Sequence, residues 1–300
     1  PIFAMPYAEF LMRAGKARLV EPALRETLQA DPTYLPAYQL LAQSYLNSGE
    51  LVAAQKVADV VAKLGNQAVA TNHLQGAVDM ARNQFDSSIA AYKKAYELSP
   101  EETQPMVALV GSYLRAGKLK EAQAFLQSVL AASPDNLGAR LLQARLAAQA
   151  GDAKAAQAGF DAVLQRDPKN AQAYLGQLGL LTSAQKLDEA DALLQKGLQQ
   201  IPGDFSLRLA RASLMEQRHQ PEQAITLYEQ LHKDRPNAEV VINNLAGLLA
   251  DARSTEADYK RAYELAQGLR ASSVPQFKDT VGWTAYRMKR YAEAAGPLRD

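Results

Sequence analysis

The residue types that most often carry chemistry are few and scattered in this sequence. Three histidines, His73, His219 and His232, stand far apart, and the chain contains no cysteine. The histidines lack the paired spacing of a zinc site on one helix. The absence of thiols excludes disulfides, thiolate metal ligands and cysteine nucleophiles. We therefore expect no metal centre, no cofactor and no enzyme activity.

Other short motifs have a simpler structural interpretation. The stretch Ala-Gly-Lys occurs at 14–16 and at 116–118. The rest of a phosphate-binding loop is missing around it, so both stretches are predicted to be turns between helices. Acidic residues such as Glu121 and Asp188 stand where helices are expected to begin. A carboxylate at that end complements the helix dipole, so no catalytic pair is implied.

The charge and hydropathy of the chain exclude further classes of protein. Its 300 residues carry 33 Lys and Arg against 32 Asp and Glu, a net charge of +1. Bulk electrostatics therefore favours neither nucleic acid nor an anionic membrane as a partner. No apolar run approaches the roughly 20 residues of a transmembrane helix. Because the sequence begins at Pro1 and stops within a repeat, we expect it to be a fragment.

A repeat of 34 residues organises the chain. Prolines recur at this interval, at Pro100, Pro134, Pro168, Pro202 and Pro236. A fixed period of this size indicates stacked units, and 34 residues is typical of a helix pair. Each proline is expected to end the second helix of a pair, because it cannot continue a helix and restricts the residue before it.

Four other positions of the repeat keep step with the prolines. A small residue recurs at position eight, a turn residue such as glycine at fifteen and alanine at twenty. Small side chains let two helices approach closely, and a larger one would overpack the contact at a cost of roughly 1–3 kcal/mol. Glycine at position fifteen allows the left-handed backbone that ends the first helix. A larger apolar residue fills position twenty-four, at Leu24, Tyr92, Leu126, Phe160, Leu194 and Tyr228.

These landmarks resemble the tetratricopeptide repeat over essentially the whole chain. The resemblance implies an all-α fold, a right-handed superhelical solenoid of about nine antiparallel helix pairs. Stacked repeats bury their apolar faces on their neighbours, so we expect one domain over residues 1–300 rather than the two that length suggests. The repeats are predicted to begin near residues 1, 35, 69, 103, 137, 171, 205, 239 and 275, the last one truncated.

The eighth repeat departs from the pattern. Placing Ala262 at position twenty requires four additional residues. The segment 251–258 is therefore predicted to form a longer helix end or a loop, since loops tolerate added length at a small entropic cost. The alternative is a projection that serves a particular partner.

The resemblance also implies a concave groove formed by the first helices, lined by positions two, five, nine, twelve and thirteen. Its small residues, amides and few arginines suit an extended peptide or a helix. Arg115 and Arg145, from adjacent repeats, either pair with a ligand carboxylate or lie solvated at the surface. The candidate partner-binding residues are Gln43, Asn47, His73, Arg115, Arg145, Gln149, Asn243, Trp283, Tyr286 and Arg287.

The single tryptophan stands in the last of these repeats. Trp283, Tyr286 and Arg287 combine aromatic and cationic side chains of the kind enriched at binding hot spots. The alternative is that they pack against a further repeat beyond the sequence.

Together these features favour a non-catalytic scaffold that binds a protein or peptide partner. The segments "NNLAGLL" at 243–249 and "DTVGW" at 279–283 are similar to long bacterial tetratricopeptide proteins of exopolysaccharide export and surface-protein sorting. This similarity favours the periplasm or cell envelope over the cytoplasm. Two alternatives stay open: self-association through uncapped ends, and a regulatory region of a larger enzyme.

Overall fold

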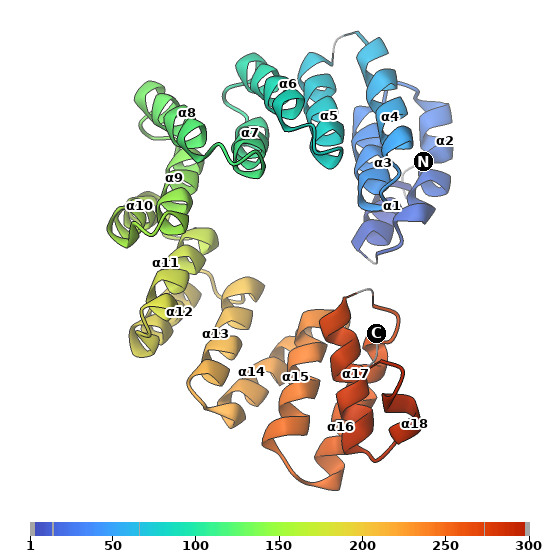
Figure 1. The fold of residues 1–300 in the computed structure, drawn as a ribbon, viewed down its shortest axis with the longest axis vertical. Helices are drawn as coiled ribbons and strands as arrows, with labels where there is room; N and C mark the ends of the chain where they lie inside the picture. The colour runs from blue at the N-terminus through green and yellow to red at the C-terminus, as the bar shows by residue number, and fades with distance from the viewer. Residues whose placement is uncertain (1–3, 14, 66, 273, 298–300) are drawn as a thin grey trace. The chain divides into compact units, whose positions relative to one another are not determined.

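Helices build the described part of the chain. The computed structural model describes residues 4–13, 15–65, 67–272 and 274–297, and each regular element in these ranges is an α-helix or a short 3-10 helix. Consecutive helices are joined by short turns and pack as pairs (Figure 1). The expected fold class, an all-α repeat solenoid, is confirmed. Two compact units divide the chain, Pro1–Leu146 and Ala147–Asp300.

The N-terminal unit consists of successive helix pairs and ends within α9. First helices of neighbouring pairs contact each other, as α1 does with α3 and α3 with α5. A 3-10 turn, η1 (Ala17–Leu19), precedes the second helix of the first pair. The α-helices are α1 (Ala4–Arg13), α2 (Val20–Ala30), α3 (Leu35–Asn47), α4 (Leu51–Lys63), α5 (Ala68–Ala81), α6 (Phe85–Leu98), α7 (Thr103–Arg115), α8 (Leu119–Ala132) and α9 (Leu137–Gln149).

The C-terminal unit continues the same alternation of first and second helices. In the described ranges of the chain, no helix has both the length and the apolarity to cross a bilayer. The elements are α10 (Ala153–Arg166), α11 (Ala171–Ser183), α12 (Leu187–Gln200), α13 (Phe205–Gln217), α14 (Pro221–Asp234), α15 (Glu239–Ala252), α16 (Glu256–Ala266), η2 (Gln267–Leu269), α17 (Pro275–Arg287) and α18 (Tyr291–Ala294).

Small residues lie where paired helices come closest. At position eight, Ala42 and Gly76 are buried, and a Cβ atom added to Gly76 would lie 2.9 Å from the Tyr92 ring. The large side chain at position twenty-four thus packs directly over a small one. The alanines at position twenty are fully buried, namely Ala54, Ala122, Ala156, Ala190 and Ala224. Burial of the large partners supplies the apolar area that stabilises each pair.

A left-handed residue ends most first helices. Glycine holds this conformation at Gly15, Gly49, Gly117 and Gly151, as predicted. Other residue types hold it in four further repeats, with φ between 56° and 60° at Asn83, Gln185, His219 and Lys289. In these four repeats the turn geometry is therefore kept without glycine, although a side chain in this region of φ strains the backbone. The eighth repeat differs, because Arg253 at the end of α15 is extended.

The inserted segment of the eighth repeat is a short loop held by one arginine. Helix α15 ends at Ala252 and α16 begins at Glu256. The Arg253 guanidinium donates to Glu222 at 2.6 Å and to Asp258 at 3.4 Å. These ion pairs fix the extra residues against α14 and α16.

We expect a pair of substitutions at position fifteen to change stability in opposite directions. Gln185→Gly should stabilise the C-terminal unit by about 1 kcal/mol, because it relieves a side chain held at positive φ. Gly151→Ala should destabilise it by a similar amount, because alanine must then adopt the φ of 82°. Urea unfolding followed by circular dichroism measures both. Equal midpoints for the two variants would contradict the assignment of strain.

Candidate functional site

The first helix of each repeat has a side that carries position nine. We call this side of the first helices the A face. Glycine stands at this position in α7 (Gly111), α11 (Gly179) and α15 (Gly247). A Cβ atom added at any of the three would meet no packing neighbour within 4 Å. Glycine inside a helix costs roughly 0.5–1 kcal/mol relative to alanine. Packing within the chain gives no reason for that cost.

Other helical glycines have an evident packing role. A Cβ atom on Gly176 would lie 2.3 Å from the Phe160 ring, and one on Gly197 would lie 3.1 Å from Leu207 and Tyr174. These positions need glycine because a neighbouring side chain fills the space. The open glycines of the A face are therefore a distinct class.

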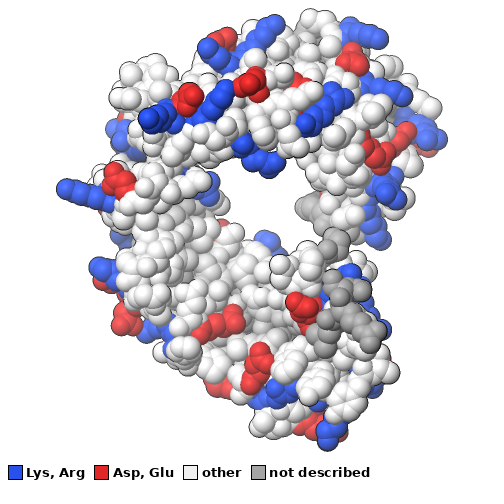
Figure 2. All heavy atoms as spheres, in the orientation of Figure 1, with Lys and Arg blue, Asp and Glu red and all other residues white. Residues whose placement is uncertain are grey.

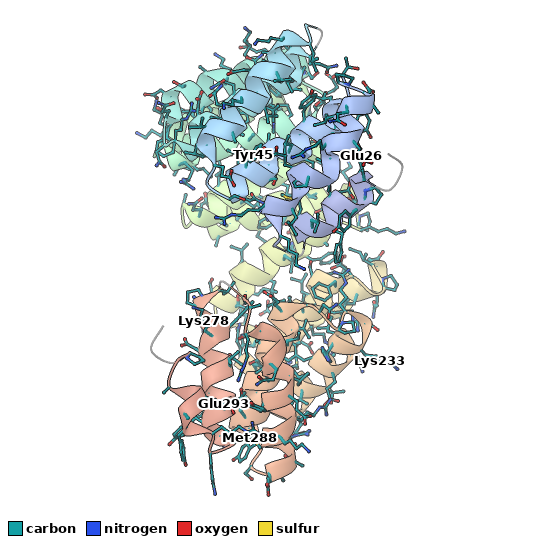
Figure 3. The ribbon with its side chains drawn as sticks, turned by 90° about the vertical axis from the view of Figure 1, so that its right-hand side faces the viewer. Glu26, Tyr45, Lys233, Lys278, Met288 and Glu293 are labelled. Atoms are coloured by element: carbon teal, nitrogen blue, oxygen red, sulfur yellow. The ribbon has the colours of Figure 1, made fainter. Side chains whose placement is uncertain are left out.

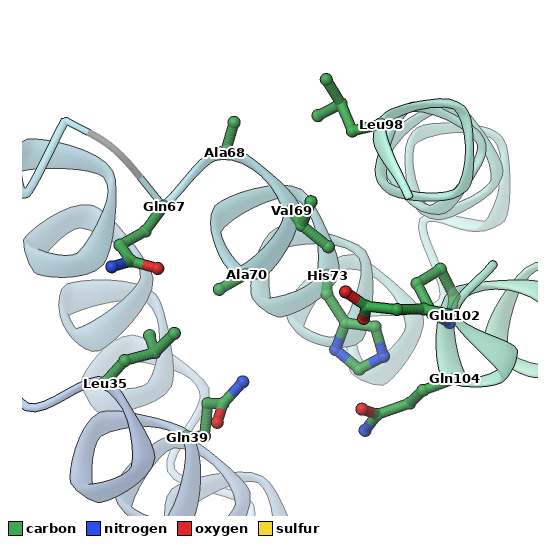
Figure 4. Close-up of a pocket in the computed structure, with 11 residues that line it drawn as sticks. Leu35, Gln39, Gln67, Ala68, Val69, Ala70, His73, Leu98, Glu102 and Gln104 are labelled. Carbon is green, nitrogen blue, oxygen red and sulfur yellow. The ribbon is translucent and has the colours of Figure 1, made fainter. Parts of the chain in front are cut away.

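In the N-terminal unit, a pocket of about 400 Å³ opens between α3, α5 and α7 (Figure 4). Apolar side chains form part of its wall, and three glutamine amides, one carboxylate and one imidazole supply its polar groups. Its volume lies within the range of about 300–1,000 Å³ of small-ligand sites. The lining residues are Leu35, Gln39, Gln67, Ala68, Val69, Ala70, His73, Leu98, Glu102, Gln104 and Pro105.

His73, a predicted site residue, lies in the wall of this pocket. Its ring meets the Tyr92 ring edge-on, with centroids 5.2 Å apart. Its Nε2 atom is buried and has no hydrogen-bond partner among the described residues. Burial lowers the pKa of the imidazole, and the nearby Glu102 carboxylate opposes this shift only in part. The ring is consequently neutral at pH 7.

Five of the other predicted residues lie exposed on first helices of the N-terminal unit or in α9. On α3, the Gln43 amide donates to the Asn47 side-chain oxygen at 2.7 Å, so these two residues act as one polar group. At the end of α7, the Arg115 guanidinium lies 5.9 Å from the centre of the Phe85 ring. Arg145 and Gln149 are exposed along α9, one turn apart.

Trp283 anchors a cluster of aromatic and arginine side chains in the C-terminal unit. Its indole Nε1–H donates to Asp251 at 2.7 Å, and its ring stacks on Tyr286 with centroids 5.5 Å apart. The Arg287 guanidinium lies over the Trp283 and Tyr259 rings and donates to the Tyr259 hydroxyl. Tyr286 stays 48% exposed. The structure therefore brings Trp283, Tyr286 and Arg287 together on one accessible surface.

A carboxylate fixes the last short helix beside this cluster. Glu293 of α18 accepts hydrogen bonds from the Tyr263 hydroxyl and from Arg270, each at 2.7 Å. These bonds, that of Tyr263 foremost, lower the pKa of the Glu293 carboxyl group. Figure 3 labels Glu293 together with Lys278 of α17 and Met288, which directly follows this helix.

Asn243, also predicted to contact a partner, forms hydrogen bonds that link helices. Its side-chain oxygen accepts from the Thr280 hydroxyl at 2.7 Å, and its amide nitrogen donates to Asn244 at 3.0 Å. Asn244 donates in turn to the Tyr228 hydroxyl, which is bonded to Glu216. Burial raises the pKa of both Glu216 and Tyr228. This network joins α13, α14, α15 and α17, so Asn243 has a structural role.

Charged side chains of both signs lie interspersed on the face drawn in Figure 2. Several are paired between neighbouring helices, as Arg218 is with Asp188 at 2.6 Å and Arg208 with Asp234 at 2.5 Å. Exposed pairs of this kind add little stability, typically below 1 kcal/mol. Local groups rather than bulk charge therefore decide what each part of the surface attracts.

Among the polar residues of the pocket, Gln67, Glu102 and Gln104 were not singled out from the sequence. Gln67 and Glu102 precede α5 and α7, where no periodic pattern predicts which way a side chain points. Gln104 occupies position two of its repeat, which is one of the groove positions. The repeat pattern could therefore have predicted it.

Comparison with known proteins agrees with the helical architecture. Residues 79–178 match the tetratricopeptide repeat. The match consists of two overlapping segments, 79–146 and 113–178, which run from the end of α5 into α11. Tetratricopeptide repeats generally serve as protein-interaction scaffolds without catalytic activity. The search of curated proteins gave no match.

Solved structures resemble the chain over most of its length. The APC/C hetero-tetramer Cut9–Hcn1 matches 94% of this chain at 13% identity with a TM-score of 0.52, and this chain covers 55% of that one. A tetratricopeptide repeat protein from Parabacteroides merdae matches 94% of this chain and 97% of its own at 16% identity, TM-score 0.49. TTC0263 from Thermus thermophilus matches over 60% of this chain and 98% of its own length, at 17% identity and with a TM-score of 0.49. Likeness at such identity shows the fold alone.

Two alanine substitutions in α11 should separate the two classes of glycine. Gly179→Ala is expected to raise stability by about 0.5–1 kcal/mol, because the added methyl group enters open space. Gly176→Ala should lower it by roughly 1–3 kcal/mol, because the methyl group meets the Phe160 ring. Chemical unfolding of the C-terminal unit within the full chain provides the comparison. A loss of stability in Gly179→Ala would show that position nine is not open.

Acid should destabilise the N-terminal unit through His73. The folded-state pKa lies below the usual 6.5, so the unfolded chain binds more protons. The stabilising contribution is complete above pH 6.5 and is lost as the pH falls through the folded pKa. The midpoint of urea unfolding should therefore decrease more steeply with falling pH in the wild type than in His73→Gln. If the unfolding midpoints of the wild type and His73→Gln change with pH in parallel, His73 is not the source of the acid sensitivity.

Proposed function

We propose that the chain is a non-catalytic scaffold whose A face binds a peptide or protein partner. The three open glycines at position nine carry this proposal. Each lies inside a helix, where glycine is unfavourable relative to alanine, and leaves a gap that no side chain among the described residues fills. Partner backbone packed into the gap at each position would account for the glycine there.

The proposed contact uses the close approach that glycine permits. Without a Cβ atom, a helix lets another backbone come nearer, which increases dispersion contacts and brings backbone polar groups within reach. In the C-terminal unit, position nine holds Gly179, Ser213 and Gly247 in successive repeats, so three small residues stand in equivalent places. This row is suited to an extended segment or a helix of the partner.

Larger side chains next to these positions would supply the specific contacts. The stacked rings of Trp283 and Tyr286 form a rigid aromatic surface, and residues of this type dominate the energetics of many interfaces. Arg115 and Arg145 stay proposed contacts for a partner carboxylate, and Gln43 with Asn47 for a backbone amide. Asn243 is less available, since its side-chain atoms already bond within the chain.

We also propose that this scaffold serves a bacterial secretion or exopolysaccharide-export assembly at the cell envelope. The support is the similarity of the segments 243–249 and 279–283, which form parts of α15 and α17. Fractionation of the native cell with an antibody against the chain tests the location. Recovery in the cytoplasmic fraction alone would remove the envelope context and leave the scaffold proposal intact.

Peptides selected from a random phage-displayed library on the immobilised chain should bind the A face. Replacing Gly179 or Gly247 with tryptophan fills the open space, and affinity for a selected, fluorescein-labelled peptide should fall at least tenfold, about 1.4 kcal/mol. Ala192→Trp is the matched control, because Ala192 is exposed on the second helix α12. Fluorescence anisotropy measures the three affinities.

Light scattering of the free chain accompanies this experiment, since self-association through the same face would compete with the peptide. The proposal is contradicted if the library yields no binder, or if Gly179→Trp and Gly247→Trp bind the peptide as tightly as Ala192→Trp does.

A further inference from the structure

The pocket of the N-terminal unit carries one formal charge at neutral pH, and it is negative. Glu102 contributes that charge, and none of the eleven lining residues is lysine or arginine. His73 adds no positive charge at pH 7, because its burial opposes protonation. The pocket is thus acidic in a chain whose overall charge is close to zero.

The Glu102 carboxylate is available to a ligand. Glu102 occupies the N-cap of α7, yet its side chain forms no capping hydrogen bond. No salt bridge among the described residues involves it, and the residue is exposed. Figure 4 shows its side chain extending from the start of α7 toward His73. The carboxylate therefore faces the pocket, and no Lys or Arg of the described residues forms an ion pair with it.

The remaining wall combines apolar surface with amides. Leu35, Val69 and Leu98 offer aliphatic surface, and Leu98 is 48% exposed although it is a large apolar side chain. The side chains of Gln39, Gln67 and Gln104 each present one carbonyl oxygen and one NH₂ group. A ligand that fits must offer an aliphatic stem, a group that donates several hydrogen bonds, and amides of its own.

We propose that this pocket binds an arginine side chain of a peptide partner, with the guanidinium at Glu102 and the flanking peptide amides at the glutamines. The inference rests on the proposed function and deepens it, because it names the chemistry of one contact with the peptide partner. Arginine fits better than lysine, since its planar fork of five donors can reach a carboxylate and amide oxygens at once. Its methylene groups match the aliphatic wall.

The test uses acetyl-Ala-Arg-Ala-amide titrated into the full chain and followed by two-dimensional NMR of backbone amides. We expect saturable shifts confined to α3, α5, α7 and the loops before α5 and α7. The analogue with citrulline, which keeps the shape and loses the charge, should bind at least tenfold more weakly. The analogue with glutamate should not bind.

Two variants of equal charge provide the matched comparison. Glu102→Gln should weaken the arginine peptide about tenfold, corresponding to about 1.4 kcal/mol. Glu101→Gln, at the exposed neighbour that does not line the pocket, should leave its affinity within twofold. Thermal melting of both variants establishes that each is folded.

Several outcomes would overturn the inference. Equal affinity for the citrulline peptide, equal effects of the two variants, or no saturable shift would exclude an arginine site. Agmatine that binds as tightly as the tripeptide would show that the peptide amides are not recognised. If the tripeptide fails while library peptides still respond to Gly179→Trp or Gly247→Trp, the pocket assignment is wrong and the scaffold proposal stands. If the tripeptide binds as expected while library peptides do not respond to Gly179→Trp or Gly247→Trp, the scaffold proposal is wrong and the pocket assignment stands.

Discussion

The close contact between a small residue on one helix and a large side chain on its neighbour determines the rest of this structure. Gly76 beneath Tyr92 and Gly176 against Phe160 are the tightest examples, and buried alanines at position twenty play the same part. A contact of this closeness fixes which side of the first helix is packed. The same contact determines which side of the first helix is left uncovered. The A face is therefore a consequence of core packing.

The two glycines of α11 show how narrow the division between core and A face is. Gly176 faces the Phe160 ring, whereas Gly179, three residues later and about 60° around the helix axis, faces open space. Packing against Phe160 explains the glycine at position 176, but packing does not explain the glycine at position 179. Because a helical glycine is unfavourable by itself, the proposed contact with a partner would explain its recurrence at Gly111 and Gly247.

The repeat period made most of the fold predictable. The first helices begin at Leu35, Thr103, Ala171 and Phe205, which are the predicted starts of their repeats, because proline and small residues act locally. The residue type does not predict the left-handed turns at Gln185 and His219. Local backbone bonds close both turns, from Lys186 N–H to the Leu181 carbonyl and from Gln220 N–H to the Met215 carbonyl. The residues of the pocket were predictable only where they belong to a first helix. The loop position of Glu102 is set by tertiary contacts, and no periodicity encodes it.

The two candidate contact regions differ in how much of their polar capacity is already used. In the C-terminal unit, Trp283 donates to Asp251 and Arg287 bonds to Tyr259, so that surface offers mainly rigid aromatic area. In the N-terminal unit, the Glu102 carboxylate keeps its hydrogen-bonding capacity. An aromatic surface can bind partners of either charge, because its affinity comes from excluding water. An unpaired carboxylate distinguishes between partners by their charge. In the proposed arginine site, specificity would rest on Glu102, because the nearly balanced charge of the chain supplies little charge discrimination.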